Sequence, residues 1–161
     1  MQISIVNEND EVVGYKERED RNVEDIIRIT AIWVTDENGN ILLQQRKLNK
    51  KNSPGKWGPG VSGTVEEGET YESNAYKELE EEIGIKNILL TKSKKFFGQT
   101  INGKRFAQLF LCKISSDQRL IPDDKEVEQL KWFSKKELLD FFKEKPENFV
   151  GLMKGLIDFL V

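Results

Sequence analysis

The sequence predicts a single domain of the α/β class, with strands and helices packed around one core. Two apolar runs rich in strand-forming residues, Ile29–Thr35 and Ile41–Gln45, predict neighbouring strands at the centre of a sheet. A stripe of Ala75, Leu79 and Ile83, repeating every fourth residue, predicts a helix packed on that core. A chain of 161 residues is long enough for one such domain, which we expect to span residues 1–161.

The remaining elements follow from turn residues and caps. Asn38-Gly39 predicts a hairpin turn between the two central strands, and Asn102-Gly103 predicts another. Further strands are expected at Ile3–Val6, Val12–Tyr15, Val61–Thr64, Ile88–Phe97, Arg105–Ile114 and Leu130–Phe133. Two helices, Lys135–Lys143 and Glu147–Leu160, are expected at the end of the chain, separated at Pro146.

Composition excludes several classes of protein. A charged fraction of 33% with a net charge of −3 argues against a broad nucleic-acid-binding surface. No apolar run approaches the ~20 residues needed to span a bilayer, so we expect no membrane partner. The first residues, MQISIVNENDE, lack the basic and apolar regions of a secretion signal. A single cysteine fits a reducing compartment, so we expect a cytoplasmic protein.

The cysteine and three aromatic residues could belong either to the core or to the functional site. Cys112 is expected to be a buried structural thiol, because the chain contains no histidine that could activate it as a nucleophile. Trp33, Trp57 and Phe97 are candidate platforms for a nucleotide base, and each is equally consistent with a core position.

The most informative stretch is the acidic segment from Gly63 to Ile85. Thr70 is a candidate N-cap for its helix, and Gly84 is a candidate for the left-handed residue that ends it. Both caps lie where the apolar stripe requires the helix to begin and end. The segment is therefore expected to be a loop followed by a helix.

Three glutamates of this helix share one face. Glu78, Glu81 and Glu82 are spaced at i, i+3 and i+4, and Glu82 lies beside the apolar stripe. Like charges at this spacing repel one another, most strongly where the helix is partly desolvated. Two interpretations fit this pattern, a solvated acidic face or a cation site. For a cation site, oxygen ligands without histidine or cysteine favour Mg²⁺ or Mn²⁺.

The spacing of the segment resembles the signature of the Nudix hydrolase family, G-x5-E-x7-R-E-U-x-E-E-x-G-U, in which U is aliphatic. Eight of its nine fixed positions match, and Lys77 stands where the family has arginine. Lysine keeps the charge but loses the bidentate fork of arginine. The matching residues are Gly63, Glu69, Glu78, Leu79, Glu81, Glu82, Gly84 and Ile85.

The resemblance implies a fold, a reaction and roles for residues. The fold is an α/β/α sandwich with a mixed sheet and a Nudix loop-helix-loop. The reaction is hydrolysis of a diphosphate, such as a nucleoside diphosphate linked to another group, by water that a divalent cation activates. Glu78, Glu81 and Glu82 would bind the cation, with Glu81 as ligand or base. The Ser62 backbone carbonyl would assist them, and Glu69 would orient the site.

Two loops could complete this site. Arg46 and Lys50 belong to a basic loop just before the segment, which is either a phosphate contact or a solvated loop. The loop that precedes Leu130–Phe133 is either a plain surface loop or the source of a catalytic base, for which Glu126 is the first candidate. Asp123, Asp124 and Glu128 are the other candidates in that loop.

From Ile3 to about Phe133 the chain also resembles isopentenyl-diphosphate isomerase, whose diphosphate contacts match Arg46 and Lys50. Isomerase activity is disfavoured, because Ser62 stands at the isomerase cysteine, Thr64 stands at a histidine ligand, and Arg105 lies near its expected glutamate. A non-catalytic nucleotide-binding module is a further alternative, against which the intact glutamates count. The resemblance also leaves a homodimer open.

Overall fold

A mixed β-sheet forms the centre of the computed structural model, which describes residues 1–160. The strands are β1 (Gln2–Val6), β2 (Val12–Glu17), β3 (Ile26–Thr35), β4 (Ile41–Arg46), β5 (Trp57–Pro59), β6 (Val61–Thr64), β7 (Thr91–Thr100), β8 (Gly103–Lys113) and β9 (Val127–Phe133). The helices are α1 (Tyr71–Ile83), α2 (Lys135–Glu144) and α3 (Leu152–Ile157), with short 3₁₀ turns η1 (Arg18–Asp20) and η2 (Pro146–Asn148).

Strand β3 organises the sheet. It pairs in parallel with β8 along its whole length on one edge, and antiparallel with β6 at Ile29–Ile32 on the other edge. The β1–β2 hairpin joins the beginning of β3, and β7 pairs with the outer edge of β8. The central position predicted for this strand is confirmed.

The turn predicted between β3 and β4 is confirmed, but the two strands pair only next to it. Only Thr35 and Ile41, which flank the turn, are paired. Further along β3 the edge that β4 would need is occupied by β6, so the two strands diverge. Strand β4 instead pairs with β9 and β5.

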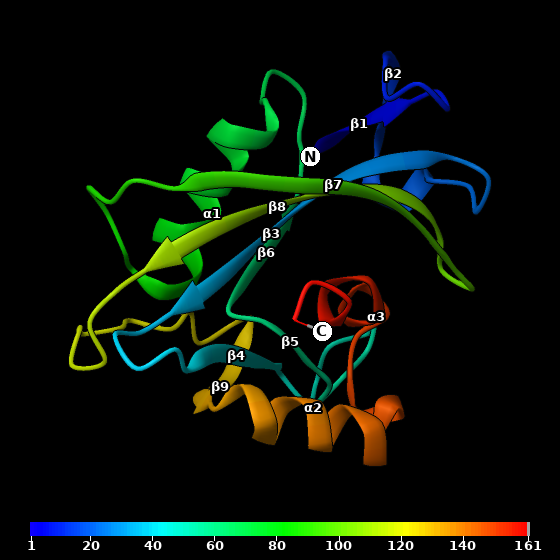
Figure 1. Cartoon of the computed structure of the whole chain (residues 1–161). Coiled ribbons are helices and arrows are strands. Elements are labelled where there is room, and N and C mark those ends of the chain that lie inside the picture. Colours follow the sequence, from blue (N-terminus) through cyan, green and yellow to red (C-terminus); the bar gives the residue numbers. More distant parts are fainter. Residues whose placement is uncertain (161) are drawn as a thin grey trace.

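Helices cover both faces of the sheet, as predicted for an α/β sandwich (Figure 1). Alternate residues of a strand point to opposite faces, so β3 contributes Ile32 and Val34 to one core and Ala31 and Trp33 to the other. The first core packs under α1, and the second packs against α2 and α3.

Helix α1 begins and ends where the sequence predicts. The Thr70 hydroxyl accepts a hydrogen bond from the Ser73 backbone N–H, and the Ser73 hydroxyl in turn accepts one from the Thr70 N–H. Gly84 adopts a left-handed conformation with φ of 74°, which glycine reaches without steric cost. The end of the helix, which carries the glutamates, is therefore set by local sequence.

The last predicted helix is shorter than expected. Instead of Glu147–Leu160, α3 covers only Leu152–Ile157. The chain is extended at Phe149, which forms a bridge with Trp57, and this contact with the sheet prevents a continuous helix.

The prediction for Cys112 can be checked directly. Cys112 is buried, and burial raises the pKa of its thiol to about 11, as expected of a structural cysteine. No helix in the described part of the chain is both long and apolar enough to cross a membrane.

Candidate active site

Two of the three predicted glutamates face the protein. Glu82 is 8% exposed, and the side chain of Glu78 is 16% exposed. Glu81 is exposed to solvent at the margin of the same helix face. Glu78 and Glu82 therefore lie on the side of α1 that faces the sheet, whereas Glu81 lies at the solvent-exposed rim of the site.

Strand β6 passes directly beneath Glu78. A Cβ atom added at Gly63 would collide with the Glu78 carboxyl group, whose Oε1 would lie 2.6 Å away. Glycine at this position is thus a spatial requirement of the site, because any side chain would occupy the place of the carboxyl.

Glu82 is held by contacts that sequence reasoning missed. Gln44 on β4 donates from Nε2 to Oε2 of Glu82 at 2.7 Å and to the Gly60 carbonyl at 2.9 Å. The Ser62 backbone amide also lies near enough to lower the pKa of the Glu82 carboxyl. The N–H and C=O of one strand residue point to the same edge, so the Ser62 carbonyl faces this site as well. The only sequence signal for Gln44 was its position in ILLQQ, a run that predicts a strand.

The charges of the buried Glu82 and the half-buried Glu78 are only partly compensated. Burial raises the pKa of Glu82 to about 8, against the lowering effect of Gln44, and the neighbouring charge of Glu78 raises it further. Burial also raises the pKa of Glu78 to about 7, although the Lys77 ammonium opposes this shift. Ionising both groups near neutral pH requires a nearby positive charge.

A hydrogen-bonded network surrounds Glu69. Its two carboxyl oxygens accept from Lys77 Nζ at 2.5 Å and from Asn74 Nδ2 at 2.7 Å. Lys77 also pairs with Glu66 at 2.9 Å and lies 3.9 Å from Glu78. Lysine at this position thus links the loop to the helix, and Glu69 is occupied by these partners.

A second loop meets the carboxyl end of α1. The last helical carbonyls, of Glu82 and Ile83, accept hydrogen bonds from the backbone N–H groups of Asp123 and Ile121 at 3.0 and 2.9 Å. This contact brings Glu126 near the site, where its charge adds to the raised pKa of Glu82.

The two candidate loops are joined by an ion pair. Lys50 Nζ lies 2.6 Å from Glu126 Oε1, and Lys47 lies 3.7 Å from Glu128. Arg46 instead donates from Nε to the Asn52 carbonyl at 3.1 Å, within its own loop. The predicted phosphate contact Lys50 and the predicted base Glu126 are therefore partners in this structure.

The donor set suits a hard divalent cation. Within residues 1–160 no three acidic, histidine or cysteine side chains converge closely enough to enclose a metal by themselves. Mg²⁺ is usually held by one or two carboxylates, with water and substrate phosphate completing its shell. Glu78, Glu82 and the Ser62 carbonyl fit that pattern.

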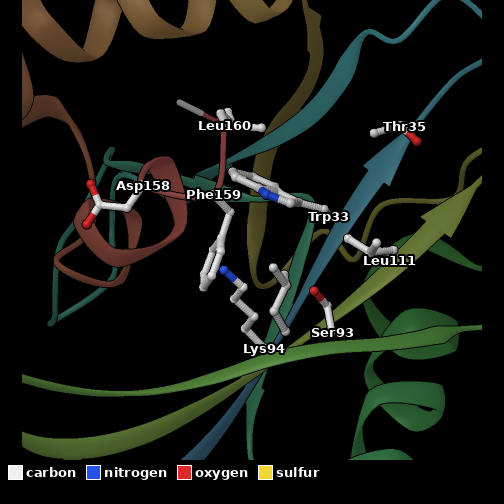
Figure 2. Close-up of a pocket in the computed structure, with 9 residues that line it drawn as sticks. Trp33, Thr35, Ser93, Lys94, Leu111, Asp158, Phe159 and Leu160 are labelled. Atoms are coloured by element: carbon white, nitrogen blue, oxygen red, sulfur yellow. The ribbon is translucent and has the colours of Figure 1, made fainter.

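A separate hollow of about 450 Å³ lies on the opposite face of the sheet, between β3, β7, β8 and the end of the described chain. Figure 2 shows Trp33, Lys94 and Phe159 around it, and none of the predicted metal ligands lines it. Trp33 is 3% exposed and Trp57 is 9% exposed, so both are core residues, whereas Phe97 is 49% exposed.

Fold and site together define an α/β/α protein with a glutamate-bearing loop-helix-loop. Residues 26–152 match the model of the NUDIX domain family. Nudix hydrolase YfcD of Escherichia coli K12 is 31% identical over 137 residues, covering 84% of this chain and 75% of that protein. Nudix hydrolase PA4841 of Pseudomonas aeruginosa is 31% identical over 73% of this chain and 70% of its own length. The chain belongs to the Nudix family, and the prediction of a Nudix pyrophosphohydrolase is confirmed at that level.

Solved structures agree on the fold. DR0079 of Deinococcus radiodurans superposes with a TM-score of 0.86 at 22% identity, and the alignment covers 99% of both chains. The MutT protein of Methanosarcina mazei gives a TM-score of 0.71 at 19% identity over 87% of this chain and 96% of its own. The predicted Nudix-type sandwich is thereby confirmed.

Proposed function

We propose that this chain hydrolyses a diphosphate linkage in a small molecule with the help of Mg²⁺ or Mn²⁺, and that residues 1–161 act as one Nudix domain. The observation that carries the proposal is the pair of carboxyls at the edge of β6, of which Glu82 is buried and Glu78 is half-buried. Burial disfavours the ionised form of both carboxyls, so the pair is poorly suited to a purely structural role. They are well suited to a site completed by a cation and a polyanion.

Each residue has a distinct task in this proposal. Glu78 and Glu82 hold the cation together with the Ser62 carbonyl, and Glu81 at the rim is a further ligand or a base. When bound, the cation supplies neutralisation of the diphosphate and a lower pKa for the attacking water. Glu69 keeps Lys77 in place beside Glu78.

The basic loop contributes to phosphate binding. Lys50 lies within reach of the second loop, where it neutralises Glu126. A substrate phosphate that takes over Lys50 would release Glu126, which could then accept a proton from the attacking water. Water adds to one phosphorus, the bridging P–O bond breaks, and the bridging oxygen leaves with the other phosphate. Arg46 is close in sequence and adds positive charge.

The substrate class is a nucleoside diphosphate linked to another group, or a similar diphosphate. Structures that share this fold include an Ap4A hydrolase of Caenorhabditis elegans and the NUDIX domain of NrtR from Shewanella oneidensis bound to ADP ribose. Isomerase chemistry is disfavoured, because Ser62 and Thr64 replace the required thiol and imidazole and the chain contains no histidine.

The test is hydrolysis of a panel of nucleoside triphosphates, ADP-ribose, dinucleotides and isopentenyl diphosphate, with Mg²⁺, Mn²⁺ or EDTA. We expect turnover that requires metal and that falls at least about a hundredfold in Glu82→Gln, because a ligand to the cation is lost. Glu72→Gln, an exposed change on the same helix, is the matched control. Metal binding without turnover of any compound would favour a binding module. Full activity of a folded Glu82→Gln variant would refute the assignment.

A further inference from the structure

Two arginines lie side by side at the end of the sheet where β3 and β8 begin. Arg21 donates from Nη2 to the Lys104 carbonyl at 3.2 Å, and its Nε is buried with no hydrogen-bond partner among residues 1–160. Arg105 donates from Nη2 to the Thr100 hydroxyl at 2.8 Å. Both side chains are partly buried. A guanidinium has five N–H donors, so most donors of the two arginines form no hydrogen bond to protein atoms of residues 1–160.

Little opposite charge is free to pair with the two guanidiniums, because the Asp25 carboxylate, which favours the charged form of Arg21, accepts its hydrogen bonds from Lys16 and Asn22. In the described part of the chain neither forms an ion pair, because the nearby carboxylates are committed elsewhere. Asp25 pairs with Lys16 at 2.7 Å, and Glu24 pairs with Lys104 at 2.6 Å. Burial lowers the pKa of Arg105, and the adjacent charge of Arg21 lowers it further. Two neighbouring, partly desolvated cations are costly unless an anion joins them.

Backbone geometry holds the two arginines in place. A Cβ atom added at Gly103, where φ is +122°, would collide with the Arg21 guanidinium, so this side chain packs directly on the backbone. A Cβ atom at Gly151, just before α3, would lie 3.9 Å from Nη2 of Arg105. Arg21 therefore lies against the β7–β8 turn, and Arg105 lies close to the residue that precedes α3.

Strand register relates this pair to the carboxylate site. On β8, Arg105 shares a face with Ala107, which belongs to the core under α2 and α3. Ala107 is level with Ile29 on β3, and Ile29 is level with Thr64 on β6. Two strand spacings and two residues along a strand separate Arg105 from Thr64, or about 12 Å between Cα atoms. Thr64 follows the Ser62–Gly63 edge where the diphosphate is proposed to bind, and because Gly63 faces Glu78, the neighbouring Thr64 faces the same side of the sheet as Arg105.

We propose that Arg21 and Arg105 bind a second phosphate of the substrate, a phosphate monoester on one of the two groups that the diphosphate joins. This proposal rests on the proposed function, because it places the diphosphate at Glu78 and Glu82. It narrows the substrate class to diphosphates that carry a second, distal phosphate. Two guanidiniums supply paired donors that match the geometry of a phosphate. Free inorganic phosphate is the other source of the same chemistry.

The first experiment measures binding of inorganic phosphate by calorimetry in EDTA. EDTA removes any bound cation, and comparison of each arginine variant with the wild-type protein separates binding at the arginines from binding at Lys50 and other basic residues. We expect Arg105→Gln and Arg21→Gln to weaken binding at least about tenfold, and Arg105→Lys to retain part of it. Arg119→Gln, an exposed change of the same type, should have no effect. Thermal denaturation of each variant checks that it is folded.

The second experiment separates the two sources of phosphate. Under the same conditions, affinities for coenzyme A and dephospho-coenzyme A, and for NADPH and NADH, are compared in the wild-type protein and in Arg105→Gln. A preference of about tenfold for the phosphorylated member of a pair, lost in the variant, supports the proposal. Arginine-dependent binding of free phosphate without such a preference overturns the substrate assignment and leaves inorganic phosphate as the ligand.

Two further outcomes distinguish this inference from the proposed function. No arginine-dependent binding of phosphate or of either ligand pair would overturn the inference, whatever the enzyme hydrolyses. Arginine-dependent binding in a protein that hydrolyses nothing would contradict the proposed function and leave the anion site standing.

Discussion

The buried carboxyl of Glu82 should make the stability of the metal-free protein fall as pH rises. In the unfolded chain this group ionises near its ordinary pKa of 4.5, whereas in the folded protein burial raises the pKa to about 8. Between these values the folded state retains a proton that the unfolded state has released. Linkage then requires that the free energy of unfolding decreases with increasing pH over this window.

The magnitude follows from the width of the window. Each pH unit within it costs about 1.4 kcal/mol, so raising the pH from 5 to 7 should cost about 3 kcal/mol through Glu82 alone. Glu78, whose pKa burial raises to about 7, acts in the same direction. Glu82→Gln removes the ionisation but keeps the size of the side chain and its place beside Gln44. The variant should therefore be more stable than the wild-type protein at pH 7, and similar to it at pH 4.5.

The assay is urea denaturation followed by tryptophan fluorescence in EDTA, at several pH values from 4.5 to 8. Glu72→Gln, on the exposed side of the same helix, should follow the wild-type profile. Saturating Mg²⁺ should reduce the difference, because a bound cation favours the ionised carboxyls. Parallel profiles for the wild-type protein and Glu82→Gln in EDTA would refute the conclusion that burial raises the pKa of this carboxyl.

Three substitutions test other parts of the site. Gln44→Ala should raise the Mg²⁺ concentration needed for half-maximal activity about tenfold or more, because Glu82 loses its hydrogen-bond donor; an unchanged Mg²⁺ dependence would contradict this role. Gly63→Ala should displace the Glu78 carboxyl, reduce activity as far as Glu78→Gln does, and cost about 1–3 kcal/mol in urea denaturation; wild-type activity would exclude the steric argument. Gly84→Ala should cost about 1–2 kcal/mol through its left-handed conformation, and equal melting of variant and wild-type protein would show that the helix end can adapt.

Much of the site could be predicted from sequence because its main element is local. The glutamates of α1 share a face through helical spacing alone, and Thr70 and Gly84 set the ends of that helix. The strands were largely predicted for the same reason, since alternation and turn residues act over a few positions. The extent of the β3–β4 pairing and the length of α3 were not, because each depends on a competing partner from elsewhere in the chain.

Only the tertiary structure shows which of these side chains contact one another. Gln44 reaches Glu82 across 38 positions of sequence, and Lys50 meets Glu126 across 76. Arg21 and Arg105 lie still further apart in the chain, and the contact of Arg21 with the Lys104 carbonyl brings them near each other.

The sequence by itself thus determined the family, the acidic helix and the class of chemistry, because fixed spacing on one element is written in consecutive residues. The surroundings that tune the carboxyls, and the arginine pair that narrows the choice of substrate, arise from packing between distant segments. No pattern of neighbouring residues in the sequence predicts those contacts.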